Sequence, residues 1–170
     1  MSSDVCFHCS QPSIAGFNLD IDGAQRAFCC AGCQAIAMAI VNGGLENFYT
    51  YREGQNLRPD LAAETAGQSY TVYDQPNVQA DFVQRLNSDA GNSLACINVD
   101  GITCAACVWL IEKHLSSVPG IIKVSINASS HQGRITFNHE VLRVSEIFSA
   151  LAKIGFKASP NTGDEAQAAW

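Results

Sequence analysis

Two cysteines separated by two alanines, Cys104 and Cys107, follow a predicted strand and open a predicted helix. The N-terminus of a helix stabilises a thiolate, and two thiolates at this spacing can bind one soft cation together. Such a pair suits Cu(I), which accepts two sulfur ligands, better than Zn(II), which takes four ligands. No carboxylate adjoins the pair, because Thr103 precedes it, although Asp100 is close in the sequence. We therefore expect Cu(I) at Cys104 and Cys107; the alternatives are a redox pair and two buried structural thiols.

A second group of cysteines lies near the N-terminus and comprises Cys6, Cys9, Cys29, Cys30 and Cys33. Without Cys29, the other four form two CxxC knuckles at the spacing of a zinc ribbon or treble clef. Metal bound to Cys6, Cys9, Cys30 and Cys33 would stabilise a stretch too short to bury a sufficient core. The alternative is a Cu(I)–thiolate cluster that includes the vicinal pair Cys29 and Cys30 together with Cys33. The group is therefore expected to hold Zn(II) or Cu(I).

Two other side chains near these cysteines are expected to stay outside the metal sites. His8 lies between Cys6 and Cys9, and we expect it to be solvated and not a ligand. Cys96 alternates with Ile97 on a predicted strand, so its side chain points away from the face that Ile97 occupies. We therefore interpret Cys96 as an incidental thiol.

The elements that must position Cys104 and Cys107 alternate between strand and helix. The predicted strands cover 94–99, 121–128, 133–138 and 156–159, and the predicted helices cover 105–117 and a segment from Ser145 to Gly155. Period-two apolar alternation indicates the strands, and apolar residues at helical spacing indicate the helices. The order βαββαβ predicts a ferredoxin-like unit over residues 92–159 in an α+β protein.

The N-terminal part is expected to be a small cysteine-rich module with helices over residues 1–52. A helix is predicted from Ala31, with a break at Gly43-Gly44 before apolar residues resume. Residues 53–91 are expected to be a linker with an extended piece at 70–73 and a helix from Pro76 to Asn87. The tail, residues 160–170, is expected to be disordered.

Composition and charge exclude several classes of protein. Eight of the 170 residues are cysteines, which is about half the cysteine fraction, roughly 8–10%, of a short disulfide scaffold. The net charge is −6, and the excess of acids lies within residues 1–90, which argues against a nucleic-acid partner. Apolar runs such as Ala35–Val41 are far shorter than the about 20 residues of a membrane span. No secretory signal is visible, so we expect a soluble, cytosolic chain with reduced thiols.

The segment Gly101 to Cys107, GITCAAC, resembles the GMxCxxC signature of heavy-metal-associated domains. The resemblance covers about residues 92–159, with Ile102 where many members have methionine. It implies that Cys104 and Cys107 are the metal ligands and that Phe156 supports the metal loop. The arrangement of an FCCxGC segment at Phe28 to Cys33 before this domain resembles the cytosolic N-terminus of FixI/CcoI-type copper-exporting P-type ATPases.

That second resemblance implies a bacterial inner-membrane pump that moves Cu(I) out of the cytosol for assembly of a respiratory oxidase. The chain would lie on the cytoplasmic side and would contact a copper chaperone and the catalytic and membrane domains of the pump. Trp109 and Leu110 lie off the main apolar stripe of their helix and are expected to pack on the first module, on those domains, or in a wider core face. No DKTG phosphorylation loop or nucleotide-binding motif is present, so the chain alone is expected to hydrolyse nothing. The rival hypotheses are a thiol–disulfide oxidoreductase and a free-standing metal-responsive protein.

Overall fold

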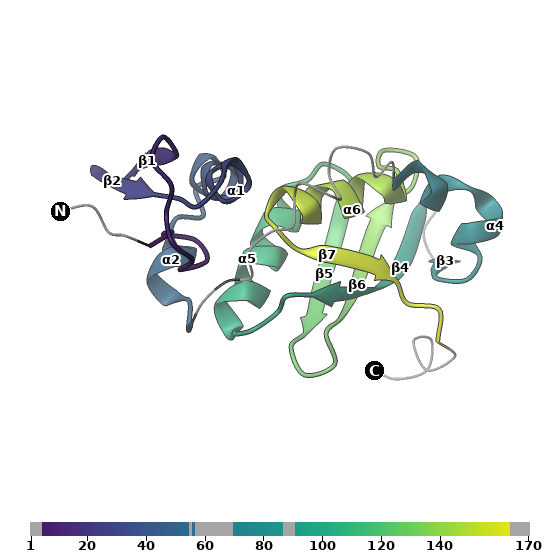
Figure 1. The fold of residues 1–170 in the computed structure, drawn as a ribbon. Coiled ribbons are helices and arrows are strands. Elements are labelled where there is room, and N and C mark those ends of the chain that lie inside the picture. Colours follow the sequence, from purple (N-terminus) through teal and green to yellow (C-terminus); the bar gives the residue numbers. More distant parts are fainter. Residues whose placement is uncertain (1–4, 55, 57–69, 87–90, 164–170) are drawn as a thin grey trace.

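Two units, each carrying one group of cysteines, pack side by side in the computed structural model of this chain (Figure 1). The structure describes residues 5–54, 56, 70–86 and 91–163. Among these residues no helix combines the length and the apolar character that crossing a membrane requires.

The first unit consists of a hairpin followed by two helices. Its elements are β1 (Asn18–Ile21), β2 (Ala24–Ala27), α1 (Ala31–Asn42) and α2 (Asn47–Tyr51). The strands pair in antiparallel register around Asp22 and Gly23, which both have positive φ, as a tight hairpin turn with an Asp-Gly sequence requires. The helix predicted from Ala31 and its break at Gly43-Gly44 are confirmed. The hairpin was not predicted, although its Asp-Gly turn is a hairpin signal.

The second unit has the predicted βαββαβ order. Its elements are β4 (Asn92–Asp100), α5 (Ala105–Ser116), β5 (Ile121–Asn127), β6 (Gln132–Asn138), α6 (Val144–Lys153) and β7 (Lys157–Pro160). The strands form an antiparallel sheet in the order β4-β6-β5, and β7 pairs with the C-terminal half of β4 (Figure 1). The helices α5 and α6 contact each other, and apolar side chains from both join the sheet in one core. The α+β class and the ferredoxin-like fold are confirmed.

The segment before the ferredoxin-like unit differs from its prediction. It contains a 3-10 helix, η1 (Tyr70–Asp74), a single helical turn, α4 (Pro76–Gln79), and a strand, β3 (Val83–Arg85). The prediction of an extended piece at 70–73 was therefore wrong, and the helix begins at Pro76 as predicted but ends at Gln79, well before Asn87. Phe82 is buried in the core and Val83 pairs with Ala95 of β4, so pairing with the sheet replaces the helix that the local pattern favoured.

The helix α6 begins at Val144, so its N-cap is Arg143 and not Ser145, the N-cap that the sequence predicts. A distant carboxylate binds its first turn. Ser145 lies inside the first turn, where the Asp74 carboxylate accepts hydrogen bonds from the Ser145 backbone N–H at 3.0 Å and from its hydroxyl at 2.7 Å. Gly155 ends the helix with φ +87, as predicted from the sequence. The Asp74 contact ties η1 to α6, and aromatic contacts of Tyr70 and Tyr73 with Phe148 reinforce the same junction.

Apolar side chains of the first unit extend the core of the second. Ile36, Ile40, Leu45 and Phe48 belong to the same buried cluster as the ferredoxin-like core. In Figure 1, α1 and α2 lie on the side of the second unit that carries α5, and α2 packs on α5 while α1 contacts α6. Leu110 is buried in this cluster and Trp109 is half-buried against it. The two modules are thus joined by an apolar contact on the helical side of the second unit.

Candidate metal centres

Four of the five N-terminal cysteines bring their sulfur atoms together. The Sγ atoms of Cys6, Cys9, Cys29 and Cys33 all lie within 4.8 Å of one another. Each of the four side chains is at most 3% exposed. Four thiols at such separations can become the four ligands of one tetrahedral ion, such as Zn(II), once their protons leave.

A turn and a helix start hold these sulfur atoms in place. Cys6 and Cys9 belong to a turn closed by the Ser10 N–H, which donates to the Cys6 carbonyl at 2.9 Å, and Phe7 N–H donates to the carbonyl of Ala27 at 2.8 Å. Cys29 and Cys33 lie directly after β2, where α1 begins: Cys29 precedes the N-cap, and Cys33 is in the first turn of the helix. The hairpin therefore carries the helix start back against the first turn, and the cluster forms where the two meet.

Cys30 lies beside the four-thiol group and is not one of its members. It is the N-cap of α1, and its Sγ accepts a hydrogen bond from the Cys33 N–H at 3.5 Å. Its Sγ is 3.7 Å from that of Cys29, and it alone of the five N-terminal cysteines is only partly buried. The spacing predicted that Cys30 completes the set and Cys29 is the extra thiol, and the structure places them the other way round. The extended N-cap conformation turns the Cys30 side chain back over the helix start and leaves Cys29 facing Cys9 and Cys33.

Burial and hydrogen bonding shift the pKa values of these thiols in opposite directions. Burial raises the pKa of Cys29 to about 12 and also raises the pKa of Cys33. Burial acts in the same direction on Cys6, but backbone N–H groups, that of Cys9 foremost, outweigh it and lower the pKa of Cys6. The metal-free group therefore combines readily ionised thiols with thiols that release their protons only when a cation replaces them.

His8 is buried, which contradicts the expectation of a solvated side chain. It is 4% exposed, and its Nδ1 lies 3.0 Å from the hydroxyl oxygen of Tyr49. Burial, with a smaller contribution from the charge of Arg52, lowers the pKa of His8 to about 4. The imidazole is accordingly neutral at physiological pH, and it lies outside the four-thiol group. Its role in the described structure is to anchor the first turn to α2.

Arg52, the residue that ends α2, was not identified from the sequence. Its guanidinium donates hydrogen bonds to the carbonyls of Phe7 and His8, the second at 2.7 Å. The same group lies over the rings of Tyr49 and Phe7, at 4.9 and 5.4 Å from their centroids. A planar group with several N–H donors can hold two successive carbonyls in this way, whereas a lysine cannot. Arg52 thus fixes the backbone between Cys6 and Cys9.

The second centre lies where β4 leads into α5. Cys104 is the N-cap of α5, and its Sγ is 3.5 Å from that of Cys107 in the first turn. Cys107 is buried, Cys104 is partly buried, and the Thr103 hydroxyl is 3.6 Å from the Cys107 sulfur. Ile102 is 6% exposed in the core beneath the loop. The structure therefore brings the two predicted thiols together at a helix N-terminus with one side open.

The first unit reaches the second centre through the end of α2. Burial tends to raise the pKa of Cys104, but backbone N–H groups of Glu53, Cys107 and Ala106, together with the Cys107 thiol, lower it on balance. Burial lowers the pKa of Arg52, and electrostatic interactions, with Tyr49 foremost and then with Cys6, Cys9 and Cys104, oppose that shift. Arg52 therefore interacts with thiols of both groups, whereas the Glu53 N–H acts on Cys104.

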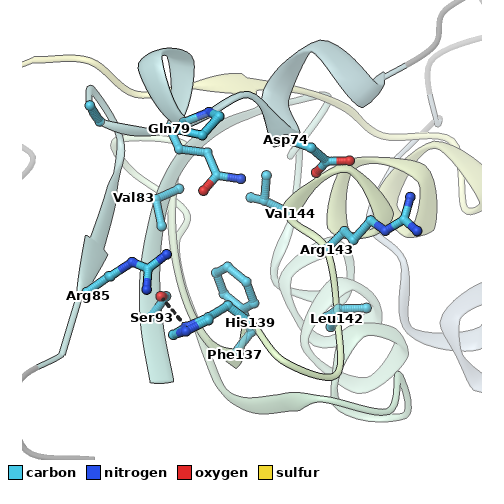
Figure 2. A pocket seen from close by; sticks show the side chains of 12 residues that line it. Asp74, Gln79, Val83, Arg85, Ser93, Phe137, His139, Leu142, Arg143 and Val144 are labelled. Atoms are coloured by element: carbon cyan, nitrogen blue, oxygen red, sulfur yellow. Dashed lines mark hydrogen bonds between the residues drawn. The ribbon is translucent and has the colours of Figure 1, made fainter. Parts of the chain in front are cut away.

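Two other features stand apart from the metal centres. Cys96 packs with Leu94 and Leu86 in a small separate cluster, and its interpretation as an incidental thiol stays a prediction. A cavity of about 390 Å³ lies near the start of β4, at the end of that strand remote from the Cys104 loop (Figure 2). Arg85, Ser93 and His139 contribute to its wall, and Ser93 Oγ is 2.9 Å from His139 Nδ1. Its lining contains no cysteine.

Each unit matches a family of metal-binding modules. Residues 5–87 match the family described as "Putative metal-binding domain of cation transport ATPase". Residues 97–157 match the family of heavy-metal-associated domains. The second unit is thus similar to heavy-metal-associated domains over most of its length. Its matched range contains Cys104, Cys107 and both helices, so the family resemblance of the GITCAAC segment is confirmed.

The chain also resembles parts of much longer proteins, of whose length it spans less than a fifth. Copper-transporting ATPase 1 of Mus musculus is 29% identical over 120 residues, which cover 64% of this chain and 8% of that protein. A copper-exporting P-type ATPase of Staphylococcus haemolyticus is 29% identical over 140 residues, which cover 82% of this chain and 17% of that protein.

This chain is 29% identical to a solved structure from Bacillus subtilis. That structure is the N-terminal domain of a potential copper-translocating P-type ATPase in the Cu(I)-loaded state. The match has a TM-score of 0.40 and covers 42% of this chain and 90% of that domain.

Proposed function

We propose that this chain is the metal-binding and regulatory region of a Cu(I)-exporting P-type ATPase and that Cys104 and Cys107 receive the ion. The observation that carries the proposal is the pair of sulfur atoms 3.5 Å apart at the N-terminus of α5, within a heavy-metal-associated domain. The surrounding sheet is antiparallel, unlike the parallel βαβ setting of a thioredoxin-like redox pair. The relatives named as copper pumps support copper as the cargo.

Thiolate exchange is the mechanism that the open side of this centre favours. Two-coordinate Cu(I) leaves room for an incoming thiolate, so a copper chaperone could share the ion before releasing it. Cys104 is partly exposed and has a lowered pKa, which suits it to bind the ion first. Cys107, buried behind it, would then displace the last thiolate of the donor. The ion stays bound to sulfur throughout, so no free copper is released.

The four-thiol group is proposed to hold Zn(II) or Cu(I) and to stabilise the first unit. Four buried sulfur atoms match the ligand number of a structural zinc site. Cys30 beside them supplies the additional thiol that a Cu(I)–thiolate cluster would use. Tight zinc that resists displacement by Cu(I) would identify a structural site, whereas a group that stays empty until Cu(I) is added would identify a second copper site.

We propose a pump of the FixI/CcoI type on the bacterial inner membrane that supplies copper for a respiratory oxidase of high oxygen affinity. The FCCxGC segment and the match of residues 5–87 to a metal-binding family of cation transport ATPases support this type. The chain would then lie on the cytoplasmic side and contact a chaperone and the catalytic and membrane domains, with no catalysis of its own.

Titration of the reduced chain with Cu(I) in the presence of a competing chelator tests the proposed cargo site. The double variant Cys104→Ala/Cys107→Ala is expected to lose one tightly bound Cu(I) per chain. Cys96→Ser, which removes a thiol remote from both centres, is the matched control and should bind as the parent does. Unchanged stoichiometry and affinity in the double variant would reject the assignment.

A further inference from the structure

The five thiols of the first unit differ in access as well as in position. The four that lie within 4.8 Å of one another are buried. Cys30 is partly exposed, yet its sulfur is 3.7 Å from that of Cys29. A donor outside the protein can therefore reach Cys30 while the Cys29 sulfur remains one van der Waals contact behind it.

Buried thiols alone form a poor entry route for a thiophilic ion. Metal exchange between thiolates is associative, because the incoming sulfur must bind before the outgoing sulfur leaves. Neither Cys29 nor Cys33, at 3% and 0% exposure, can contact the ligand shell of a donor directly. Cys30 can do so, and the Cys33 N–H that donates to its sulfur at the start of α1 stabilises the thiolate.

We propose that Cys30 is the exchange thiol of the first unit, which takes a thiophilic ion from a donor and passes it to Cys29. This inference rests on the proposed function only in that the four-thiol group binds Cu(I) or Zn(II). The distance of 3.6 Å from Cys29 to both Cys9 and Cys33 continues the route into the group. Cys30 is thus a transient ligand, and the final ligands come from the four buried thiols.

The transfer is a sequence of ligand substitutions without a change of oxidation state. For Cu(I), the Cys30 thiolate first forms a Cu–S bond and one donor thiolate leaves. The Cys29 thiol then binds the same ion, its proton passes to solvent, and the second donor thiolate departs. Finally Cys33 binds with loss of its proton, and the Cu–S bond to Cys30 breaks and returns Cys30 to the thiolate form. Release of the ion follows the same steps in reverse.

Loading rate and equilibrium affinity separate this role from that of an ordinary ligand. The full-length chain carrying Cys104→Ala/Cys107→Ala provides a background in which the first unit holds the thiols that bind the ion. Cu(I) from its glutathione complex and Zn(II) from a chromophoric chelator are used as probes in separate arms. Cys30→Ser is suitable because serine is a good N-cap and preserves the start of α1. Cys29→Ser and Cys96→Ser are compared in the same background.

We expect Cys30→Ser to change the rate of metal loading, and Cys29→Ser to change the equilibrium affinity. Cys30→Ser should slow both loading and chelator-driven removal by at least about tenfold while leaving the affinity within about threefold of the background. Cys29→Ser should weaken binding itself by about tenfold or more, and Cys96→Ser should change neither quantity.

Two results would overturn the exchange role. Loading of Cys30→Ser at the background rate would show that the ion enters without Cys30, and a loss of affinity equal to that of Cys29→Ser would make Cys30 a final ligand. In both cases the four-thiol group would still bind metal. A background chain that binds neither probe would instead refute the proposed metal site, and with it the inference.

Discussion

Replacing Arg52 by methionine tests whether one side chain fixes the backbone between Cys6 and Cys9. The variant keeps much of the aliphatic stem but removes both hydrogen bonds to the carbonyls of Phe7 and His8. Hydrogen bonds from a charged donor contribute about 1.5–3 kcal/mol each. Because Arg52 is half-buried and its freed carbonyls can be partly hydrated, we take the lower end, about 3 kcal/mol for the pair.

Loss of the stacking over Phe7 and Tyr49 adds about 0.5–1 kcal/mol to that cost. Arg26 supplies a matched control, because its guanidinium also lies over the Phe7 ring, at 4.6 Å from the centroid. Arg26→Met should therefore cost no more than about 1 kcal/mol. Arg52→Lys should fall between the two, since an ammonium group keeps the charge but cannot span two successive carbonyls.

Urea unfolding of the reduced, zinc-loaded chain measures these differences, and chelator competition measures zinc affinity in parallel. Arg52→Met is expected to lower the free energy of unfolding by about 3–4 kcal/mol. It should also weaken zinc binding by about 10–100-fold, as loss of a group that orients metal ligands does. If Arg52→Met and Arg26→Met unfold within about 0.5 kcal/mol of each other, the proposed role of Arg52 in holding the first turn is refuted.

A buried imidazole, a helix-start carboxylate and a glycine with positive φ give three more measurable effects. Burial lowers the pKa of His8 to about 4, below its unfolded value of about 6.5, so the unfolded state binds more protons between these pH values. The free energy of unfolding of the metal-free chain should therefore fall by about 2 kcal/mol from pH 7 to pH 5. His8→Gln should remove that part of the pH dependence in urea unfolding. Asp74→Ala should cost about 1–2 kcal/mol because it removes the two oxygens that accept from Ser145 in the first turn of α6, and an equal unfolding midpoint in parent and variant would contradict this role. Gly155→Ala should cost about 1–3 kcal/mol, since φ is +87 and the new Cβ would lie 2.8 Å from Ile36 Cδ1, whereas Gly44→Ala, with φ +68 and open space, isolates the cost of the backbone conformation alone.

Local sequence patterns were sufficient to predict the fold of the second unit and the position of its thiol pair. Alternation along β4, helical spacing along α5 and the CxxC between them lie within 25 residues of sequence, and each follows from short-range physical preferences. The assembly of Cys104 with Cys107 needs only a helix start, which the motif itself encodes. For this reason the ferredoxin-like order and the position of the second pair could be predicted without knowledge of distant contacts.

The features that were not predicted depend on contacts between distant residues or on the direction of one side chain. Phe82 and Val83 join the sheet because β4 offers them a partner, and the local pattern of apolar residues cannot report that partner. The choice between Cys29 and Cys30 depends on how the N-cap turns its side chain. Arg52 reaches carbonyls more than forty residues away, so nothing near it in the sequence indicates its role.

Copper K-edge absorption spectroscopy tests the central claim most directly. The reduced full-length chain is first loaded with zinc at the four-thiol group and then given one equivalent of Cu(I). We expect a low-coordinate Cu(I) with two sulfur ligands, and we expect this signal to disappear in Cys104→Ala/Cys107→Ala while the zinc remains. A copper environment that contains nitrogen or oxygen ligands, or one that is unchanged in the double variant, would contradict the assignment of Cys104 and Cys107 as the copper site.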